Sequence, residues 1–125
     1  MMSKIYLIDD SGTIRLSMEG VLQRAGHEVA TAADGMEALE TLKGGYRPDL
    51  IITDVHMPRL DGLSLIRQVR GLPQFRKTPI LVLTTESQQE KREQARQNGA
   101  TGWLVKPVSA EKMMEVLDKV LPGAA

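Results

Sequence analysis

The sequence predicts an α/β fold, a doubly wound five-stranded parallel sheet with helices on both faces. Short, mainly apolar runs are typical of strands buried on both sides, as the strands of a parallel sheet are. Segments with helical spacing of apolar residues separate these runs, which predicts right-handed crossovers. The chain has 125 residues and is 42% hydrophobic, enough to build the core of one domain.

The strands and helices alternate along the whole chain. The segments at 27–31 and 103–105 are the weakest strand candidates, and we expect both at the edges of the sheet. The expected strands are 5–8, 27–31, 50–53, 80–83 and 103–105, and the expected helices are 11–26, 34–44, 61–71, 87–98 and 109–121.

Four of the expected helices begin at a residue whose side chain can cap the first turn. Ser11 and Asp61 stand directly before helical apolar patterns. Asp34 and Ser87 are each followed three residues later by a glutamate, which is the spacing of a capping box. Glycine or Asn-Gly follows the first four helices, as is common at helix ends.

The expected helix at 87–98 is unusual because Ala95 is its only apolar residue. A helix that is polar nearly all round is poorly anchored to a core. The pattern alone favours a solvated surface helix. The alternative is an element that shifts or meets a partner.

Composition excludes several classes of protein. Acidic and basic residues balance at 16 each without a basic run, which argues against a nucleic-acid-binding module. The absence of cysteine excludes disulfides and thiolate metal sites. Only four apolar residues follow the first four residues, too few for a signal peptide, and no run approaches a membrane span. We therefore expect a soluble, cytoplasmic protein.

Chemically complementary residues follow four of the five expected strands. Asp9 and Asp10 follow the strand at 5–8, and Asp54 follows the strand at 50–53. Thr84 follows the strand at 80–83, and Lys106 follows the strand at 103–105. The carboxyl ends of parallel strands meet at one edge of a sheet, where ligands bind. Carboxylates with few other ligands suit Mg²⁺, which also takes waters and a phosphate oxygen.

Three carboxylates at one edge repel each other unless a cation neutralises them, and Lys106 supplies only one positive charge. A carboxylate near a metal can also act as a nucleophile that accepts a phosphoryl group. Taken singly, each residue is better explained as a cap or a loop residue. An ordinary explanation for all of them together is much less plausible, which favours a phosphoryl-transfer site around Asp54 with Thr84 and Lys106.

These residues also form a set of motifs at fixed spacing. Asp10, Asp54, Thr84 and Lys106 are separated by 44, 30 and 22 residues. The motifs are Asp9-Asp10, Asp54 with Met57-Pro58 and Asp61-Gly62, Thr84, and Lys106-Pro107. Over its whole length the chain resembles the response-regulator receiver domains of two-component signalling, and more narrowly the single-domain, CheY-like chemotaxis regulators. The resemblance implies a flavodoxin-like sheet with strand order 2-1-3-4-5.

The resemblance implies a role for each residue of the acidic cluster. Asp54 is the phosphoacceptor. Asp9, Asp10 and Asp54 bind Mg²⁺ together with the backbone carbonyl of His56, and Asp10 is the more direct ligand of the pair. The phosphoryl donor is a phosphohistidine on a sensor kinase. The sequence has no nucleotide-binding glycine loop, in agreement with this donor.

The same resemblance assigns the remaining site residues. Thr84 and Lys106 bind phosphoryl oxygens, and the Lys106-Pro107 bond is cis. Trp103 stands where many receivers carry the Tyr or Phe of an aromatic switch, and the resemblance places it and the polar helix at 87–98 on the face that changes on phosphorylation. It lies an odd number of residues before Lys106, so the two side chains should face opposite ways on a strand. His56 and Glu86 occupy positions that tune dephosphorylation.

The expected protein is a stand-alone phosphorylation switch and not an enzyme with its own substrate. Residues 1–125 would form a single receiver domain without an output domain, because the chain ends just past the last helix. The expected partners are a chemotaxis-type sensor histidine kinase and a flagellar motor switch protein, with a phosphatase as a further candidate, and the protein is expected to be a monomer. One alternative is a phosphorelay carrier that passes phosphate to a histidine phosphotransfer protein. A remote alternative is a phosphatase of the haloacid dehalogenase type, which wants a second aspartate where this chain has His56.

Overall fold

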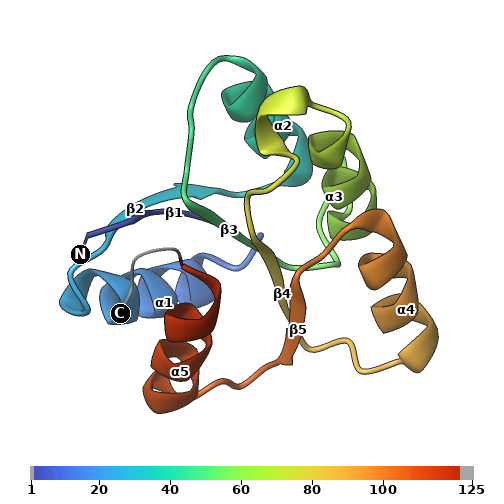
Figure 1. The fold of residues 1–125 in the computed structure, drawn as a ribbon. Helices are drawn as coiled ribbons and strands as arrows, with labels where there is room; N and C mark the ends of the chain where they lie inside the picture. The colour runs from blue at the N-terminus through green and yellow to red at the C-terminus, as the bar shows by residue number, and fades with distance from the viewer. Residues whose placement is uncertain (1, 122–125) are drawn as a thin grey trace.

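The computed structural model describes residues 2–121 and shows a central sheet with helices on both faces (Figure 1). All neighbouring strands are parallel, in the order β2-β1-β3-β4-β5, which confirms the expected topology. Pro122 and Gly123, expected after the last helix, lie outside the described residues. The elements are β1 (Lys4–Ile8), α1 (Gly12–Arg24), β2 (Glu28–Ala32), α2 (Gly35–Lys43), β3 (Leu50–Thr53), α3 (Gly62–Arg70), the 3-10 helix η1 (Pro73–Phe75), β4 (Ile80–Thr84), α4 (Gln89–Asn98), β5 (Gly102–Val105) and α5 (Ala110–Val120).

The sheet separates two cores, one beneath α2, α3 and α4 and the other beneath α1 and α5 (Figure 1). Side chains of each strand alternate between them, with Tyr6 and Ile8 of β1 in the first core and Ile5 and Leu7 in the second. Because both faces are covered, the central strands are apolar at nearly every position. Within residues 2–121 no helix has the length and apolar character needed to cross a membrane.

Three of the four predicted helix caps are confirmed, because Ser11, Asp34 and Asp61 each accept a hydrogen bond from the backbone N–H three residues later. Ser109 caps α5 in the same way. The cap predicted at Ser87 is wrong, because α4 starts two residues later, after Gln88, and no side chain caps it. The edge strand predicted at 27–31 is shifted by one residue, to Glu28–Ala32.

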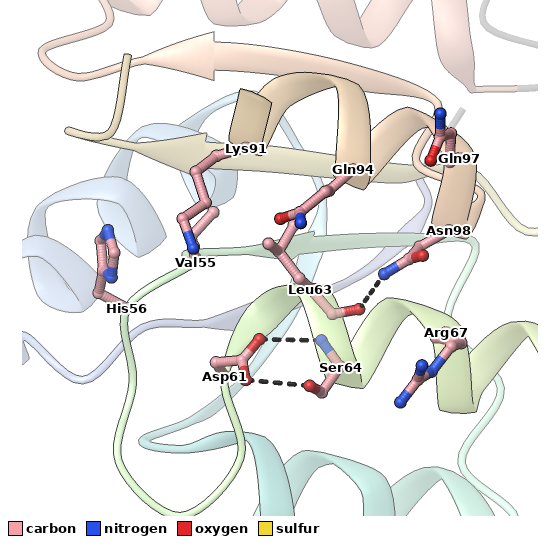
Figure 2. Close-up of a pocket in the computed structure, with 10 residues that line it drawn as sticks. All are labelled: Val55, His56, Asp61, Leu63, Ser64, Arg67, Lys91, Gln94, Gln97 and Asn98. Carbon is pink, nitrogen blue, oxygen red and sulfur yellow. Dashed lines mark hydrogen bonds between the residues drawn. The ribbon is translucent and has the colours of Figure 1, made fainter. Parts of the chain in front are cut away.

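Helix α4 is fixed mainly at its C-terminal end. Ala95 is its only buried residue. The Asn98 side-chain amide donates to the Leu63 carbonyl of α3 at 2.9 Å (Figure 2), and Arg70 Nε donates to the Gly99 carbonyl at 3.0 Å. The N-terminal end of α4 has no such side-chain cap, so the two ends are held very differently.

Gly62 brings the start of α3 into close contact with the end of β3. Its N–H donates to the Val55 carbonyl at 2.8 Å. A Cβ atom at this position would lie 2.0 Å from the backbone oxygen of Asp54, far inside van der Waals contact. Only glycine fits here without moving the backbone around Asp54.

We therefore expect Gly62→Ala to lower the free energy of unfolding by about 2 kcal/mol, because the clash is with backbone and cannot be relieved by a rotamer change. The control is Gly20→Ala in α1, where the added Cβ meets only the flexible end of Arg24. That change should raise the free energy of unfolding by about 0.5 to 1 kcal/mol, because alanine loses less entropy in a helix. Urea unfolding of both variants measures the difference. Equal stability of Gly62→Ala and the wild type would contradict the close contact.

Candidate functional site

Three carboxylates meet at the carboxyl ends of the two central strands. Asp9 directly follows β1 and Asp54 directly follows β3, and these strands are neighbours in the sheet. One oxygen from each of Asp9, Asp10 and Asp54 lies within 4.8 Å of the others. Asp9 and Asp54 are buried, whereas Asp10 is exposed. Close carboxylate oxygens with one side open to solvent fit a hard divalent cation such as Mg²⁺.

Backbone N–H groups fix one oxygen of each buried carboxylate. The Ser11 N–H donates to Asp9 Oδ1 at 2.9 Å, and the Val55 N–H donates to Asp54 Oδ1 at 2.6 Å. In both cases the donor lies just beyond a strand end. The backbone segment that follows each strand therefore fixes the orientation of the carboxylate at the end of that strand.

Lys106 binds the second oxygen of both buried carboxylates. Its Nζ atom lies 2.6 Å from Asp9 Oδ2 and 2.9 Å from Asp54 Oδ2, and its side chain is only 10% exposed. Burial lowers the pKa of Lys106, but hydrogen bonds and charge from Asp9 and Asp54 outweigh it, so the pKa lies above its ordinary value. The ammonium group therefore stays charged and joins β5 to the two central strands.

Asp54 is kept ionised despite its burial. Burial raises the pKa of Asp54, but the Thr84 hydroxyl and the Lys106 ammonium lower it by more, so the pKa lies below its ordinary value. Thr84 is the fully buried last residue of β4, and its hydroxyl accepts a hydrogen bond from the Glu86 N–H at 3.1 Å. An anionic carboxylate between an ammonium group and a hydroxyl is suited to attack an electrophile such as a phosphoryl group.

His56 and Glu86 form a second polar contact beside the acids. His56 Nε2 lies 2.8 Å from Glu86 Oε1, joining the loop after β3 to the loop after β4. The hydrogen bond with His56 lowers the pKa of Glu86. His56 lies at one end of a groove between α3 and α4 (Figure 2). The groove has a volume of about 570 Å³. Its lining is mostly polar, so the groove is a wet surface feature rather than an apolar ligand pocket.

Trp103 does not join the acidic cluster. Its side chain packs against the core beneath α2, α3 and α4 and lines a hollow beside α4. Lys106 instead lines a hollow with Ile14 and Met18 of α1, on the opposite face of the sheet. The two side chains thus face opposite ways, as the strand period predicts, and the Lys106-Pro107 peptide bond is cis, as the resemblance implies.

An ion pair near the site was not predicted from the sequence. Arg59, in the loop after β3, binds Asp34 at the start of α2 through Nε and Nη2, at 3.1 and 3.2 Å. Arg59 also has a positive φ of 69°. Sequence patterns give no signal for either feature, because the partners are 25 residues apart and left-handed backbone usually indicates Gly or Asn.

Comparison with known proteins agrees with this geometry. Residues 5–118 match the family described as the response regulator receiver domain. The chain is 35% identical over 119 residues to chemotaxis protein CheY1 of Helicobacter pylori, covering 94% of this chain and 96% of the relative. Among solved structures, chemotaxis response regulator CheY4 of Vibrio cholerae shares 46% identity, with a TM-score of 0.90 over 97% of this chain and 100% of that chain.

A second solved structure includes a metal. The receiver domain of a Pseudomonas aeruginosa sensor histidine kinase has a magnesium ion coordinated in its active site cleft. It shares 30% identity with this chain, with a TM-score of 0.88 over 96% of this chain and 98% of its own length. The sequence motifs, the arrangement of the strand-end residues and these similarities lead to one conclusion: the chain belongs to the response-regulator receiver family, and CheY chemotaxis proteins are among its homologues.

Proposed function

We propose that this protein is a phosphorylation-activated switch in which Asp54 accepts a phosphoryl group from a phosphohistidine of a sensor kinase. The observation that carries the proposal is the environment of Asp54. Its carboxylate is buried and ionised, and it lies between the Lys106 ammonium and the Val55 N–H, with two further carboxylates nearby. This is the arrangement that phosphoryl transfer to a carboxylate needs.

We further propose that Asp9, Asp10, Asp54 and the backbone carbonyl of His56 bind Mg²⁺. The oxygen-only donor set and the mutual distances of the three carboxylates support this ion, as does the magnesium in the Pseudomonas aeruginosa receiver domain. When bound, Mg²⁺ supplies positive charge that offsets the acids and the transferred phosphoryl group.

Lys106 and Thr84 form new hydrogen bonds after the phosphoryl group is transferred to Asp54. In the unmodified protein Lys106 binds Asp54 Oδ2, the oxygen that is not held by the Val55 N–H. With a phosphoryl group on Asp54, the ammonium pairs with a phosphoryl oxygen, and the Thr84 hydroxyl turns to donate to another. The Thr84 hydroxyl then gives up its bond from the Glu86 N–H, which lies just before α4.

The signal is a shift in α4 and Trp103. The loop before α4 contains the hydrogen bond from the Glu86 N–H to the Thr84 hydroxyl, and no side chain caps the start of the helix. The C-terminal end of α4 is instead held by Arg70 and Asn98. Movement of Thr84 leaves space beside β5, into which the indole turns. In this proposal α4 is the responsive surface that the family resemblance implies, and not merely a solvated helix.

His56 and Glu86 set the lifetime of the phosphorylated state. Their hydrogen bond links the two loops that flank Asp54, so it controls how a water molecule reaches the phosphoryl group. The protein assists its own phosphorylation and dephosphorylation in this way and has no separate substrate.

The output is a change in partner binding in chemotaxis. Relatives that are CheY chemotaxis proteins, matched over nearly their whole length, support a chemotaxis-type kinase as donor and a flagellar motor switch protein as target. They also support residues 1–125 acting in the cytoplasm as one receiver domain.

Asp54→Asn should abolish labelling by acetyl phosphate in the presence of Mg²⁺, because an amide is not a nucleophile. Intact mass spectrometry measures the added phosphoryl group. Asp49→Asn is the matched control, since Asp49 lies before β3, at the opposite end of the strand, and it should label like the wild type. Full labelling of Asp54→Asn would assign the acceptor to another residue.

Mg²⁺ should raise the melting temperature of the wild type. An ion bound only by the folded state adds about 1.4 kcal/mol to the free energy of unfolding when its concentration is ten times its Kd. Asp10→Ala should remove most of this shift and leave the metal-free fold intact, since Asp10 is exposed. Differential scanning fluorimetry measures both, with the exposed Asp118→Ala on α5 as control. A shift of undiminished size in Asp10→Ala would be incompatible with the proposed ligands.

Beryllofluoride with Mg²⁺, a mimic of the phosphoryl group, should change the emission of Trp103 or its quenching by acrylamide. Mg²⁺ alone should change it much less. Trp103 is the only tryptophan, so the signal reports one position. Thr84→Ala should uncouple the signal from the mimic, while Thr85→Ala, at the neighbouring exposed residue, should not. Equal responses to Mg²⁺ with and without the mimic would rule out this coupling.

A further inference from the structure

We propose that Asp34 is a positioning residue for the metal-binding loop, acting through Arg59. The loop after β3, residues 55–61, includes His56, whose backbone carbonyl is the fourth protein ligand in the proposed function, on which this inference rests. Asp34 belongs to a different element, the start of α2. Its ion pair with Arg59 holds the loop in a conformation that the loop residues do not favour by themselves.

The loop contains a strained turn. Arg59 has a φ of 69°, and it is the one non-glycine residue with positive φ in the stretch 2–121. The Leu60 N–H donates to the Pro58 carbonyl at 2.8 Å, which closes a three-residue γ-turn with Arg59 at its centre. Side chains with a Cβ atom disfavour this backbone region, and such a residue persists only where its surroundings fix it.

Asp34 supplies that constraint. Arg59 Nε and Nη2 bind the two carboxylate oxygens of Asp34 in the two-pronged geometry that the planar guanidinium favours. Asp34 is itself fixed, because its Oδ1 also accepts the Glu37 N–H at 2.8 Å as the cap of α2. The ion pair thus ties a strained loop residue to a rigid helix end.

The start of α2 packs closely against the loop, so the ion pair between Asp34 and Arg59 can fix the loop conformation. A Cβ atom on Gly35, next to Asp34, would lie 2.1 Å from the Leu60 carbonyl oxygen, so the start of α2 rests directly on the turn. The other end of the loop is closed by the bond from the Gly62 N–H to the Val55 carbonyl. Arg59 is 57% exposed, and exposed ion pairs add little to global stability, so we expect the pair to affect loop geometry more than unfolding.

The test separates loop geometry from fold stability. Asp34→Asn keeps the cap of α2, because asparagine caps helices as well as aspartate does, but it removes the charged partner of Arg59. We expect it to weaken Mg²⁺ binding by about threefold to fivefold in isothermal titration calorimetry, with a metal-free melting temperature close to that of the wild type. Arg59→Ala, which keeps the strain and loses the pair, should weaken Mg²⁺ binding equally.

Arg59→Gly provides the rescue. Glycine adopts positive φ without strain, so this variant should bind Mg²⁺ like the wild type although it has no ion pair. Adding Asp34→Asn to Arg59→Gly should then have no further effect. Glu37→Gln controls for the loss of negative charge, because Glu37 lies in the same helical turn as an exposed acid, and it should leave Mg²⁺ affinity near the wild-type value.

The outcomes distinguish the inference from the function on which it rests. Wild-type protein that binds Mg²⁺, together with unchanged affinity in Asp34→Asn, would overturn the positioning role alone. So would an Asp34→Asn effect that persists in the Arg59→Gly background, or one matched by Glu37→Gln. Absence of Mg²⁺ binding by the wild type would overturn the metal site itself.

Discussion

The pairing of Lys106 with two buried carboxylates is the interaction on which the rest of the site depends. Asp9 and Asp54 are both nearly inaccessible to solvent, and two like charges in such a place repel strongly. The ammonium group bonds to both at less than 3 Å and compensates for part of that repulsion. It leaves a net negative site with Asp10 at the open side, which is the electrostatic condition for attracting a cation.

The fold creates this condition through the order of its strands. β1 and β3 are neighbours in the centre of the sheet, so Asp9 and Asp54 emerge side by side, while β5 at the edge delivers Lys106 from the other end of the sequence. The loops after β3 and β4 then surround the acids. They are held by contacts of different kinds: the close backbone packing at Gly62, the ion pair between Arg59 and Asp34, and the hydrogen bond between His56 and Glu86. The strands thus fix the positions of Asp9, Asp54 and Lys106, while separate contacts fix the loops that surround them.

The sequence predicted the parts of the molecule that depend on local patterns. Apolar runs on both faces indicated the central strands, and the polar residues after those runs indicated the site. The expected cap at Ser87 failed because several adjacent polar residues could each begin α4, and no apolar residue fixed its first turn. The pairs Arg59–Asp34 and His56–Glu86 were beyond prediction as contacts, because they join separate loops whose approach is set by tertiary packing.

The weak anchoring of α4 has a consequence for how such proteins diversify. Ala95 is the one residue that α4 buries, and six of its other nine residues are exposed. Substitutions at exposed positions usually change the free energy of unfolding by less than about 0.5 kcal/mol. Duplicated copies of this gene can therefore acquire new recognition surfaces on α4 while the acids and Lys106 stay unchanged. Substitutions on this one helix can thus allow paralogues to bind different partners, while the residues of the acidic site stay the same in all copies.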